Sequence, residues 1–245
     1  MNNQRWASRS CARIALASAF STMAAATLLG GPVTAADSLD LSTAEICPAS
    51  SEALERNAAA MLRDEVATRT RIHLPSCAGG PASDRVTIRI GTAETLPSAL
   101  ESLPSDLSLP PDPEGLAVWV DGQAPAPTVY LLGRDHRGAL FATGRLLRAL
   151  EMGRDQVRLD PDFRVVTAPR YPLRGHQFGY RPKTNSYDGW PPEMWEQYVR
   201  ELVVFGANAI EVIPPRSDDD DDSPHYPLPP LAAMTELSRL AEEYG

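Results

Sequence analysis

The order of apolar segments after Pro169 restricts the fold of this chain more than any other feature. Leu173–Phe178 has the pattern of a short strand, Pro192–Phe205 of an amphipathic helix, Ala209–Ile213 of a second strand and Leu231–Tyr244 of a second helix. Such alternation is typical of a parallel α/β sheet or barrel, because each helix returns the chain to the start of the next parallel strand. We therefore expect the chain from residue 169 onward to form βα units.

The part of the chain before this boundary predicts a different arrangement. Apolar residues at helical spacing alternate there with segments in which apolar and polar residues take turns, the period of a half-buried strand. We therefore expect residues 37–168 to form a compact α+β domain in which strands lie between two helices. The predicted elements are helices at 52–71 and 139–150, strands at 85–90, 116–120 and 128–132, irregular segments at 37–51 and 97–113, and a turn at 133–138.

The first 36 residues have the layout of a secretory signal peptide. Its parts are a positive region (Arg5, Arg9, Arg13), an Ala-rich apolar run (14–29) and a cleavage point after Ala35 or Ala36. A membrane anchor is the alternative, but the apolar run falls short of the roughly 20 residues that span a bilayer. The protein is therefore predicted to be secreted or periplasmic, with no membrane contact after cleavage.

The charge of the chain restricts its partners. The formal net charge is −9, and removal of the three signal-peptide arginines takes it to −12. A strongly acidic chain is a poor partner for nucleic acid or anionic membranes. A neutral or locally recognised small molecule fits this charge better.

Two cysteines stay in the mature chain, because Cys11 leaves with the signal peptide. In an oxidising compartment, Cys47 and Cys77 predict a disulfide across the first helix, which would add about 3–4 kcal/mol in the chain-entropy model. Two buried free thiols are the alternative. No Cys/His spacing predicts zinc, and no motif predicts a cofactor.

Several stretches together resemble a known group of enzymes. The segments "RNAAAMLRDEVATRTRIHL", "VTIRIG" and "YLLGRDHRGALFATGRLLRAL" resemble the small α+β domain that precedes the barrel in several glycoside hydrolases. Those enzymes include bacterial β-N-acetylhexosaminidases of family 20 and α-glucuronidases of family 67. "APRYPLRGHQFGYRP" looks like the start of their catalytic (β/α)8 barrel, and the resemblance covers about residues 50–245.

The resemblance implies an α+β N-terminal domain (37–168) followed by the first two βα units of a truncated (β/α)8 TIM barrel (169–245). Such a barrel takes about 250 residues, and Tyr171 to Gly245 supplies only 75. The catalytic acids of both families are then expected beyond this chain. The sequence lacks the Asp that follows the Arg-Gly of family 20 and the "NHWDN"-like stretch of family 67, which leaves the sugar open.

Four residues near the first barrel strand are candidates for substrate binding. Ligands of such barrels bind at the carboxyl ends of the strands, so Arg174, His176, Tyr180 and Arg181 are expected at the mouth. In family 20 the Arg of "RG" holds sugar hydroxyls, and Arg174 matches it. A structural pairing with a buried carboxylate is the alternative for Arg174. For His176 the alternative is a hydrogen-bonded core or rim histidine.

Other polar and aromatic residues have two interpretations each. Glu211, in the second strand, is either a site-lining acid or the structural partner of Arg174, since a buried carboxylate needs a partner. Tyr180, Tyr187 and Trp190 are a candidate sugar platform, or pack the loop onto the first barrel helix. Asn185 and Asp188 either bind hydroxyls or make turns. The run Asp218–Asp222 is expected to be a solvated loop rather than a calcium site, because it lacks a calcium loop's spacing.

The sequence thus predicts the N-terminal portion of a secreted glycoside hydrolase acting on polysaccharide-derived sugars. Hydrolysis in most of these enzymes needs two carboxyl groups on either side of the scissile bond. The alternative function is a non-catalytic carbohydrate-binding or interaction module, in which no acid pair completes the site.

We expect the exported protein to begin near Asp37 and to carry a Cys47–Cys77 disulfide. Intact-mass spectrometry of exported material, without and then with reductant, measures both the start of the chain and the mass of the two hydrogens gained on reduction. Two free thiols before reduction would contradict the disulfide, and a retained Met1 would contradict cleavage.

Overall fold

The computed structural model describes residues 38–245 apart from 78–83, 123–125, 180–185, 213–219 and 221. The described chain is a mixed α/β structure, and its first part is built around a five-stranded sheet in the order β2-β3-β5-β4-β8. β2, β3 and β5 run parallel, while β4 is antiparallel to both of its neighbours. The strands are β2 (Glu45–Pro48), β3 (Thr87–Thr92), β4 (Leu116–Asp121), β5 (Thr128–Gly133) and β8 (Arg164–Thr167).

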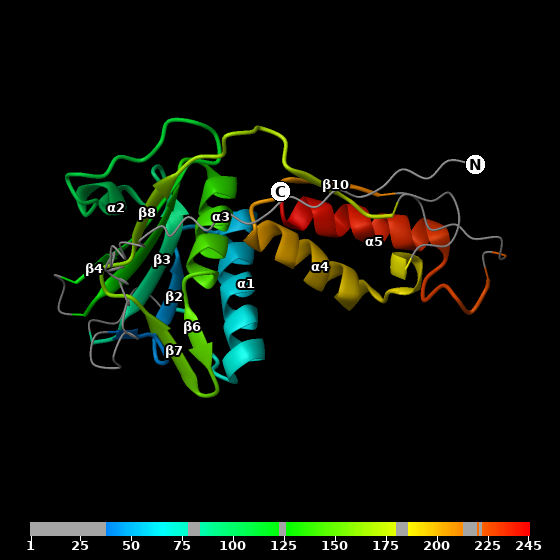
Figure 1. Ribbon diagram of the computed structural model, residues 1–245, viewed down its shortest axis with the longest axis horizontal. Helices are drawn as coiled ribbons and strands as arrows, with labels where there is room; N and C mark the ends of the chain where they lie inside the picture. The colour runs from blue at the N-terminus through cyan, green and yellow to red at the C-terminus, as the bar shows by residue number, and fades with distance from the viewer. Residues whose placement is uncertain (1–37, 78–83, 123–125, 180–185, 213–219, 221) are drawn as a thin grey trace, which may run out of the picture. The chain divides into compact units, whose positions relative to one another are not determined.

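Two long helices cover one face of this sheet (Figure 1), α1 (Ala53–Thr70) and α3 (His136–Leu147). Their apolar residues recur at helical spacing and join inward-facing strand residues in one hydrophobic cluster, which includes Leu62, Ile88 and Leu140, all fully buried. Each such side chain contributes about 1.5–3 kcal/mol by leaving water. The short helix α2 (Pro97–Glu101) and the loop after it contribute to a smaller cluster around Trp119 on the opposite face.

Several elements of this domain were not expected from the sequence. Residues 37–51 were expected to be irregular, yet they contain β1 (Leu39–Asp40) and β2. β1 pairs with β7 (Gln156–Leu159). β7 also pairs with β6 (Glu151–Gly153). These strands have two to four residues, too few for a period of two to be recognised. The expected loop at 97–113 begins with α2, and Asp135 caps α3 within the expected turn by accepting from the Gly138 N–H at 2.7 Å.

The second part of the described chain is a βαβ unit followed by a helix. β9 (Gly175–Gln177) pairs in parallel with β10 (Ala209–Glu211), and α4 (Pro192–Val204) connects them. A short helix η2 (Ser186–Gly189) precedes α4, and α5 (Pro230–Glu243) follows β10. The expected strand–helix order is present, but the described residues form no closed barrel.

α4 packs closely against α3, one of the two helices that cover the five-stranded sheet. Gly144 of α3 lies against the backbone of Val204, and a Cβ atom on this glycine would be 2.9 Å from the Val204 carbonyl oxygen. This distance is shorter than ordinary packing allows, so the absence of a side chain lets the two helices approach.

The described residues contain no helix long and apolar enough to cross a membrane. The sulfur atoms of Cys47 and Cys77 are joined in this structure, and their Cα atoms are 5.2 Å apart, which lies within the usual range for a disulfide.

Arg200 of α4 joins three helices through polar contacts. Its Nη1 donates to Glu65 of α1 at 3.4 Å, its Nη2 donates to Glu196 one turn earlier, and its Nε donates to the Tyr244 hydroxyl, after α5, at 3.2 Å. Tyr244 in turn donates to Glu196 at 3.0 Å. Burial lowers the pKa of Arg200, but its hydrogen bonds with Glu196 and Tyr244 outweigh burial and raise the pKa above its usual value.

Tyr244 makes this junction sensitive to high pH. Burial raises the pKa of its phenol to about 12, although the hydrogen bond from Arg200 acts in the opposite direction. An unfolded tyrosine titrates near 10, so above about pH 10 the unfolded chain binds fewer protons than the folded chain. We therefore expect the free energy of unfolding to fall between about pH 10 and pH 12 more steeply in the natural protein than in Tyr244→Phe.

Urea titrations of both proteins at several pH values from about 8 to 12 measure this difference. Tyr171→Phe is the matched control, because Tyr171 is 62% exposed. Equal pH slopes for the natural protein and Tyr244→Phe would contradict the assignment.

Candidate active-site face

The two strands β9 and β10 have one covered face and one open face. Ile210 and Val212 pack against the cluster formed with α4 and α5, as does Phe178 directly after β9. Because side chains alternate along a strand, Gln177 and Glu211 lie on the other face, where both are exposed. They are partners in the parallel register. We call Gly175, Gln177, Ala209 and Glu211 the open face.

Of the predicted mouth residues, Glu211 is therefore the one whose described position lies on the open face. Because Glu211 is exposed, its carboxylate does not need an ion-pair partner such as Arg174, as a buried carboxylate would. Gln177 is a neighbour that sequence reasoning missed. The signal that points to it is the apolar Phe178 directly after it, because successive side chains of a strand point to opposite faces.

His176 lies on the covered face. Its Nε2 and the Tyr198 hydroxyl of α4 are 2.9 Å apart and share a hydrogen bond. Its ring centroid lies 5.6 Å from that of Tyr198 and 6.0 Å from that of Phe178. The structure therefore places His176 between β9 and α4, as a hydrogen-bonded rim histidine.

The aromatic residues after β9 pack onto α4. The ring centroids of Trp190 and Tyr198 are 5.3 Å apart, and those of Tyr187 and Phe178 are 5.8 Å apart. Trp195 donates its indole N–H to the Tyr187 carbonyl oxygen at 2.9 Å. Tyr187 is 4% exposed and offers no face for a sugar to stack on. Tyr187 and Trp190 therefore pack the segment after β9 onto α4, which is the second of their two interpretations.

Some predicted residues lie outside the described part of the chain. Tyr180, Arg181 and Asn185 fall in the gap at 180–185. Of the run Asp218–Asp222, Asp220 and Asp222 are described and both are exposed. Asp188 is buried within η2.

Arg174 lies at the amino end of β9, opposite the end where barrel ligands bind. Its Nε donates to the Gly206 carbonyl oxygen at 2.6 Å and its Nη1 donates to that of Tyr171 at 2.9 Å. Its Nη2 donates to Glu114 Oε2 at 2.6 Å. The guanidinium carbon stands 5.3 Å from the centre of the Phe141 ring. All three guanidinium nitrogens are thus engaged within the protein.

Glu114, at the start of the turn into β4, binds residues from three other segments. Besides Arg174, it accepts from Asn208 Nδ2 at 3.0 Å and pairs with Arg137 Nη2 at 3.2 Å. Its own N–H donates to Asp135 Oδ2 at 2.9 Å. Its backbone φ of 61° is in the left-handed region, which is unfavourable for a residue with a side chain. We call Glu114, Arg137, Arg174 and Asn208 the clasp.

Asn208 completes the clasp from the second strand. Its Oδ1 accepts from the Arg174 backbone N–H at 2.9 Å, and its Nδ2 also donates to the Pro172 carbonyl oxygen at 2.8 Å. The clasp therefore connects the amino ends of β9 and β10 to the turn before β4 and to α3. Arg174 pairs with Glu114 and not with Glu211, so of its two proposed roles the contacts favour the structural one. Glu114 gave no sequence signal, because its partners lie up to 94 residues away.

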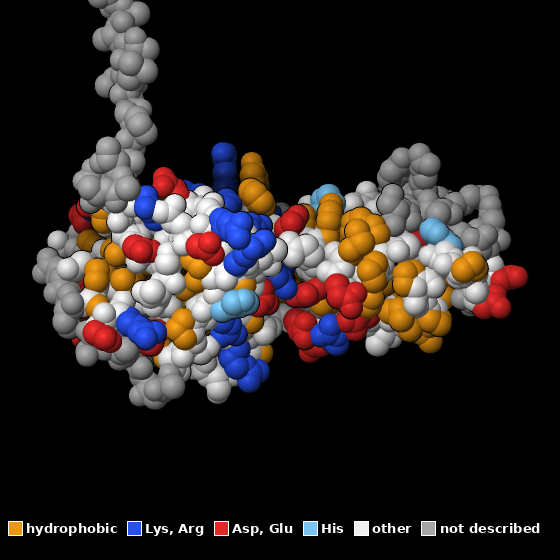
Figure 2. Space-filling model, turned by 90° about the horizontal axis from the view of Figure 1, so that it is seen from below, with side chains coloured by type: hydrophobic (Ala, Val, Ile, Leu, Met, Phe, Trp, Pro, Cys, Tyr) orange, Lys and Arg blue, Asp and Glu red, His pale blue; other side chains and the backbone are white. Residues whose placement is uncertain are grey.

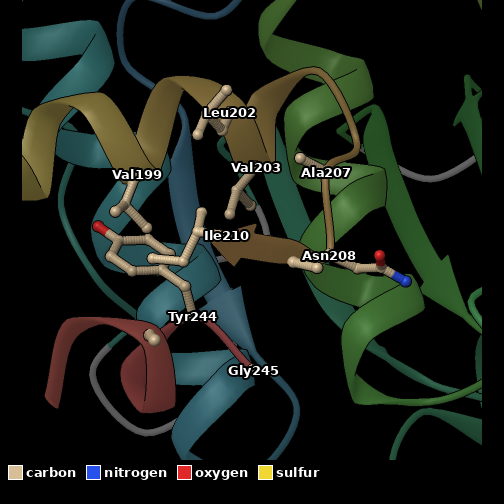
Figure 3. A pocket seen from close by; sticks show the side chains of 10 residues that line it. Val199, Leu202, Val203, Ala207, Asn208, Ile210, Tyr244 and Gly245 are labelled. Atoms are coloured by element: carbon tan, nitrogen blue, oxygen red, sulfur yellow. The ribbon is translucent and has the colours of Figure 1, made fainter. Parts of the chain in front are cut away.

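A small cavity lies on the covered side of β10 (Figure 3). Val199 and Val203 of α4, Ile210 of β10 and Tyr244 border its volume of about 60 Å³. The lining is largely apolar, and the volume is far below the roughly 300 Å³ of small ligand sites. This cavity is a packing gap between strand and helices rather than a binding site.

One group of possible metal ligands occurs among the described residues, formed by Glu45, Cys47 and Cys77. The sulfur atoms of both cysteines are joined to each other. A disulfide offers no thiolate to a metal, so this group is not a metal centre in the oxidised chain.

No known protein family matches this sequence, and no curated protein matches it significantly. Several solved structures of glycoside hydrolases are similar to this chain in fold. The 4-O-methyl-α-glucuronidase BtGH115A of family GH115 has 14% identity and a TM-score of 0.58 over 83% of this chain and 28% of its own. CpGH84B has 18% identity and a TM-score of 0.56 over 84% of this chain and 33% of its own. The GH20 β-N-acetylhexosaminidase of Streptomyces coelicolor A3(2) has 14% identity and a TM-score of 0.54 over 84% and 41%.

The chain has a glycoside-hydrolase-like fold. It spans about 28–41% of the length of these structures. At such low identity the likeness concerns the backbone arrangement, and it includes enzymes of different specificity, so it does not select one sugar.

The clasp predicts a specific stability effect. We expect Arg174→Ala to lower the free energy of unfolding by about 3–5 kcal/mol, because a buried carboxylate loses its main partner. Adding Glu114→Gln to this variant is expected to recover part of the loss, since the buried charge is then removed.

Arg239→Ala is the matched control. Arg239 also pairs with two carboxylates, but it lies on the surface of α5 with 47% of its side chain exposed, so we expect a loss below about 1 kcal/mol. Denaturant titrations measure the free energy of unfolding of the natural protein, Arg174→Ala, Arg174→Ala with Glu114→Gln, and Arg239→Ala. Similar small losses for Arg174→Ala and Arg239→Ala would show that the clasp carries no special stability.

Proposed function

We propose that this chain is the N-terminal portion of a secreted glycoside hydrolase acting on polysaccharide-derived sugars, of the α-glucuronidase-like or β-hexosaminidase-like kind. The carrying observation is that the fold likeness to glycoside hydrolases covers 84% of the chain. It therefore extends over the α+β domain as well as the βαβ unit. Residues 37–168 are proposed as the N-terminal domain and 169–245 as the start of the catalytic barrel.

The open face supports this proposal through its chemistry. In a (β/α)8 barrel the helices cover the outside, so the uncovered side of β9 and β10 corresponds to the interior. Gln177 and Glu211 would place one amide and one carboxylate there, near the carboxyl ends of the strands, where both can form hydrogen bonds with sugar hydroxyls. Tyr180 and Arg181 follow β9 and belong to the same proposed mouth, whereas His176 is proposed to hold β9 against α4.

Catalysis is proposed to depend on carboxyl groups from further strands. Glycoside hydrolysis commonly uses two carboxyl groups about 5–10 Å apart on either side of the scissile bond. β9 and β10 supply one acid, Glu211, and its exposure is unlike the apolar setting that raises the pKa of a general acid. Glu211 is therefore proposed to bind substrate rather than to transfer the proton.

Exposed apolar surface around the βαβ unit is consistent with further barrel elements. Figure 2 shows hydrophobic side chains gathered on one surface of the region that contains α4 and α5. Large exposed residues of this part include Met194, Phe205 and Leu231, with exposed fractions of 49%, 74% and 81%. In a complete barrel, neighbouring βα units bury such surface.

The proposal is tested by comparing this chain with the product of its complete reading frame. We expect the complete protein to hydrolyse an aryl glycoside of N-acetylglucosamine, glucuronic acid or a common hexose, and this chain alone to show no turnover. In the complete protein, Glu211→Gln should lower kcat/KM by about 100-fold through loss of a charge-assisted hydrogen bond.

Glu242→Gln, on the exposed surface of α5, is the matched control and should leave kcat/KM unchanged. Sugar binding by the complete protein without any hydrolysis would overturn the enzymatic proposal in favour of a carbohydrate-binding module. Turnover by the present chain that disappears in Glu211→Gln would show that the catalytic acids are already within it.

A further inference from the structure

The open face carries a single charged side chain, the carboxylate of Glu211. Glu211 and Gln177 are partners in the parallel register of β10 and β9, and both are exposed. Ile210, directly before Glu211, lines the cavity on the covered side (Figure 3), so Glu211 points away from that cavity. Within the described part of the chain, neither Glu211 nor Gln177 has a side-chain hydrogen bond or an ion pair. Both side chains are therefore available to a ligand.

The basic side chains at and beside β9 are engaged elsewhere. Arg174 lies at the amino end of the strand, where its guanidinium pairs with Glu114 at 2.6 Å. His176 lies on the covered face, and its Nε2 shares a hydrogen bond with a tyrosine of α4. Among the residues that the structure describes, none therefore neutralises the carboxylate of Glu211.

The sequence segments that follow the two strands add further negative charge. Residues 178–191 and 212–229 contain six aspartates and three cations. Of the aspartates, Asp220 and Asp222 are described and exposed. With Glu211 included, seven acids stand against three cations in this part of the chain, which is the part proposed to form the mouth. The net field of these charges repels anions.

The side-chain pair on the open face suits two hydroxyl groups of one sugar ring. Neighbouring strands lie about 4.8 Å apart, so partners in the register stand side by side. The carboxylate of Glu211 accepts hydrogen bonds from hydroxyls, and the Gln177 amide both donates and accepts. A hydrogen bond to a charged acceptor is stronger than one between neutral groups. A neutral sugar therefore finds partners for its hydroxyls here.

A uronic acid meets a less favourable environment on the same face. Its ionised carboxylate would lie near that of Glu211, and two like charges at short distance repel each other. It would also leave water without a described cation to pair with. We propose that Glu211 makes the open face selective for neutral sugars over uronic acids.

This selectivity rests on the proposed function, because it assigns a sugar class to the same face. Of the two kinds of enzyme proposed above, it favours the β-hexosaminidase-like kind, whose sugar is uncharged. It makes Glu211 a determinant of specificity as well as a group that binds substrate.

The test compares two pairs of sugars that differ in charge at one carbon. Glucose and glucuronate, and likewise galactose and galacturonate, differ in having a neutral CH2OH group or a carboxylate at C6. Ligand-observed NMR titrations of the product of the complete reading frame at neutral pH measure the Kd of each sugar. This measurement does not require turnover.

We expect each neutral sugar to bind at least about tenfold more tightly than its uronate, because a like-charge contact opposes the uronate alone. Glu211→Gln should reduce this ratio to below about threefold, since it removes both the repulsion and the charge-assisted hydrogen bond. Glu211→Asp keeps the charge and should keep most of the preference. Added salt should narrow the ratio in the natural protein, because salt screens exposed charges.

Glu242→Gln is the matched control, because it removes an exposed acid of α5 and should leave the ratio unchanged. A merely structural role of Glu211 would change the affinity for both members of a pair equally. An unchanged ratio in Glu211→Gln would therefore overturn the inference, as would the binding of none of the four sugars. Tighter binding of a uronate that is lost in Arg181→Gln would assign the selectivity to Arg181 and overturn it too.

This inference and the proposed function fail in distinguishable ways. Selective binding of neutral sugars without any hydrolysis would keep the role of Glu211 and remove the enzymatic proposal. Hydrolysis of an aryl glucuronide in preference to the matched aryl glucoside would support the hydrolase and overturn the selectivity.

Discussion

The ion pair between the buried carboxylate of Glu114 and the partly buried guanidinium of Arg174 is an interaction on which the position of β9 depends. It joins the turn before β4 to the amino end of β9, and Asn208 extends it to the amino end of β10. Buried charges cost several kcal/mol to desolvate and need nearly complete pairing, which makes such a cluster intolerant of displacement. The clasp therefore fixes the position of β9 relative to the five-stranded sheet.

This constraint separates the two ends of β9 by role. The amino end of β9 is fixed to the turn before β4, and the carboxyl end carries Gln177, which is paired with Glu211 on the open face. On the covered face, Phe178 and Trp190 pack against the ring of Tyr198 from α4. The ion pair at the amino end of β9 thus fixes the strand that carries Gln177 on its open face.

The sequence predicted the elements whose pattern is long enough to repeat. α1, α3, α4 and α5 each contain several turns of amphipathic spacing, and β4 and β5 alternate over six residues. It did not predict β1, β2, β6, β7 and β8, which have two to four residues each. β1 and β2 pair with strands that are distant in the sequence, whereas β6 and β7 form a hairpin.

The candidate site was predictable to a similar extent. The alternation in "AIEVI" correctly separated Glu211 from Ile210 and Val212, because one strand face is apolar. The position of Arg174 at the amino end of the strand follows from the predicted strand Leu173–Phe178, whereas its pairing with a residue of the turn before β4 was not predictable. Its partner Glu114 lies 60 residues earlier, in a turn whose sequence has no unusual feature.

The contact of Gly144 with Val204 has a further consequence for how this protein can vary. Two helices that meet through a bare Cα have their axes set closer than side chains would permit. Any larger residue at position 144 would push α4 outward, and β9 and β10 would move with it, because α4 lies between them in the chain. The spacing of one helix pair therefore influences where β9, β10 and the open face lie relative to the five-stranded sheet.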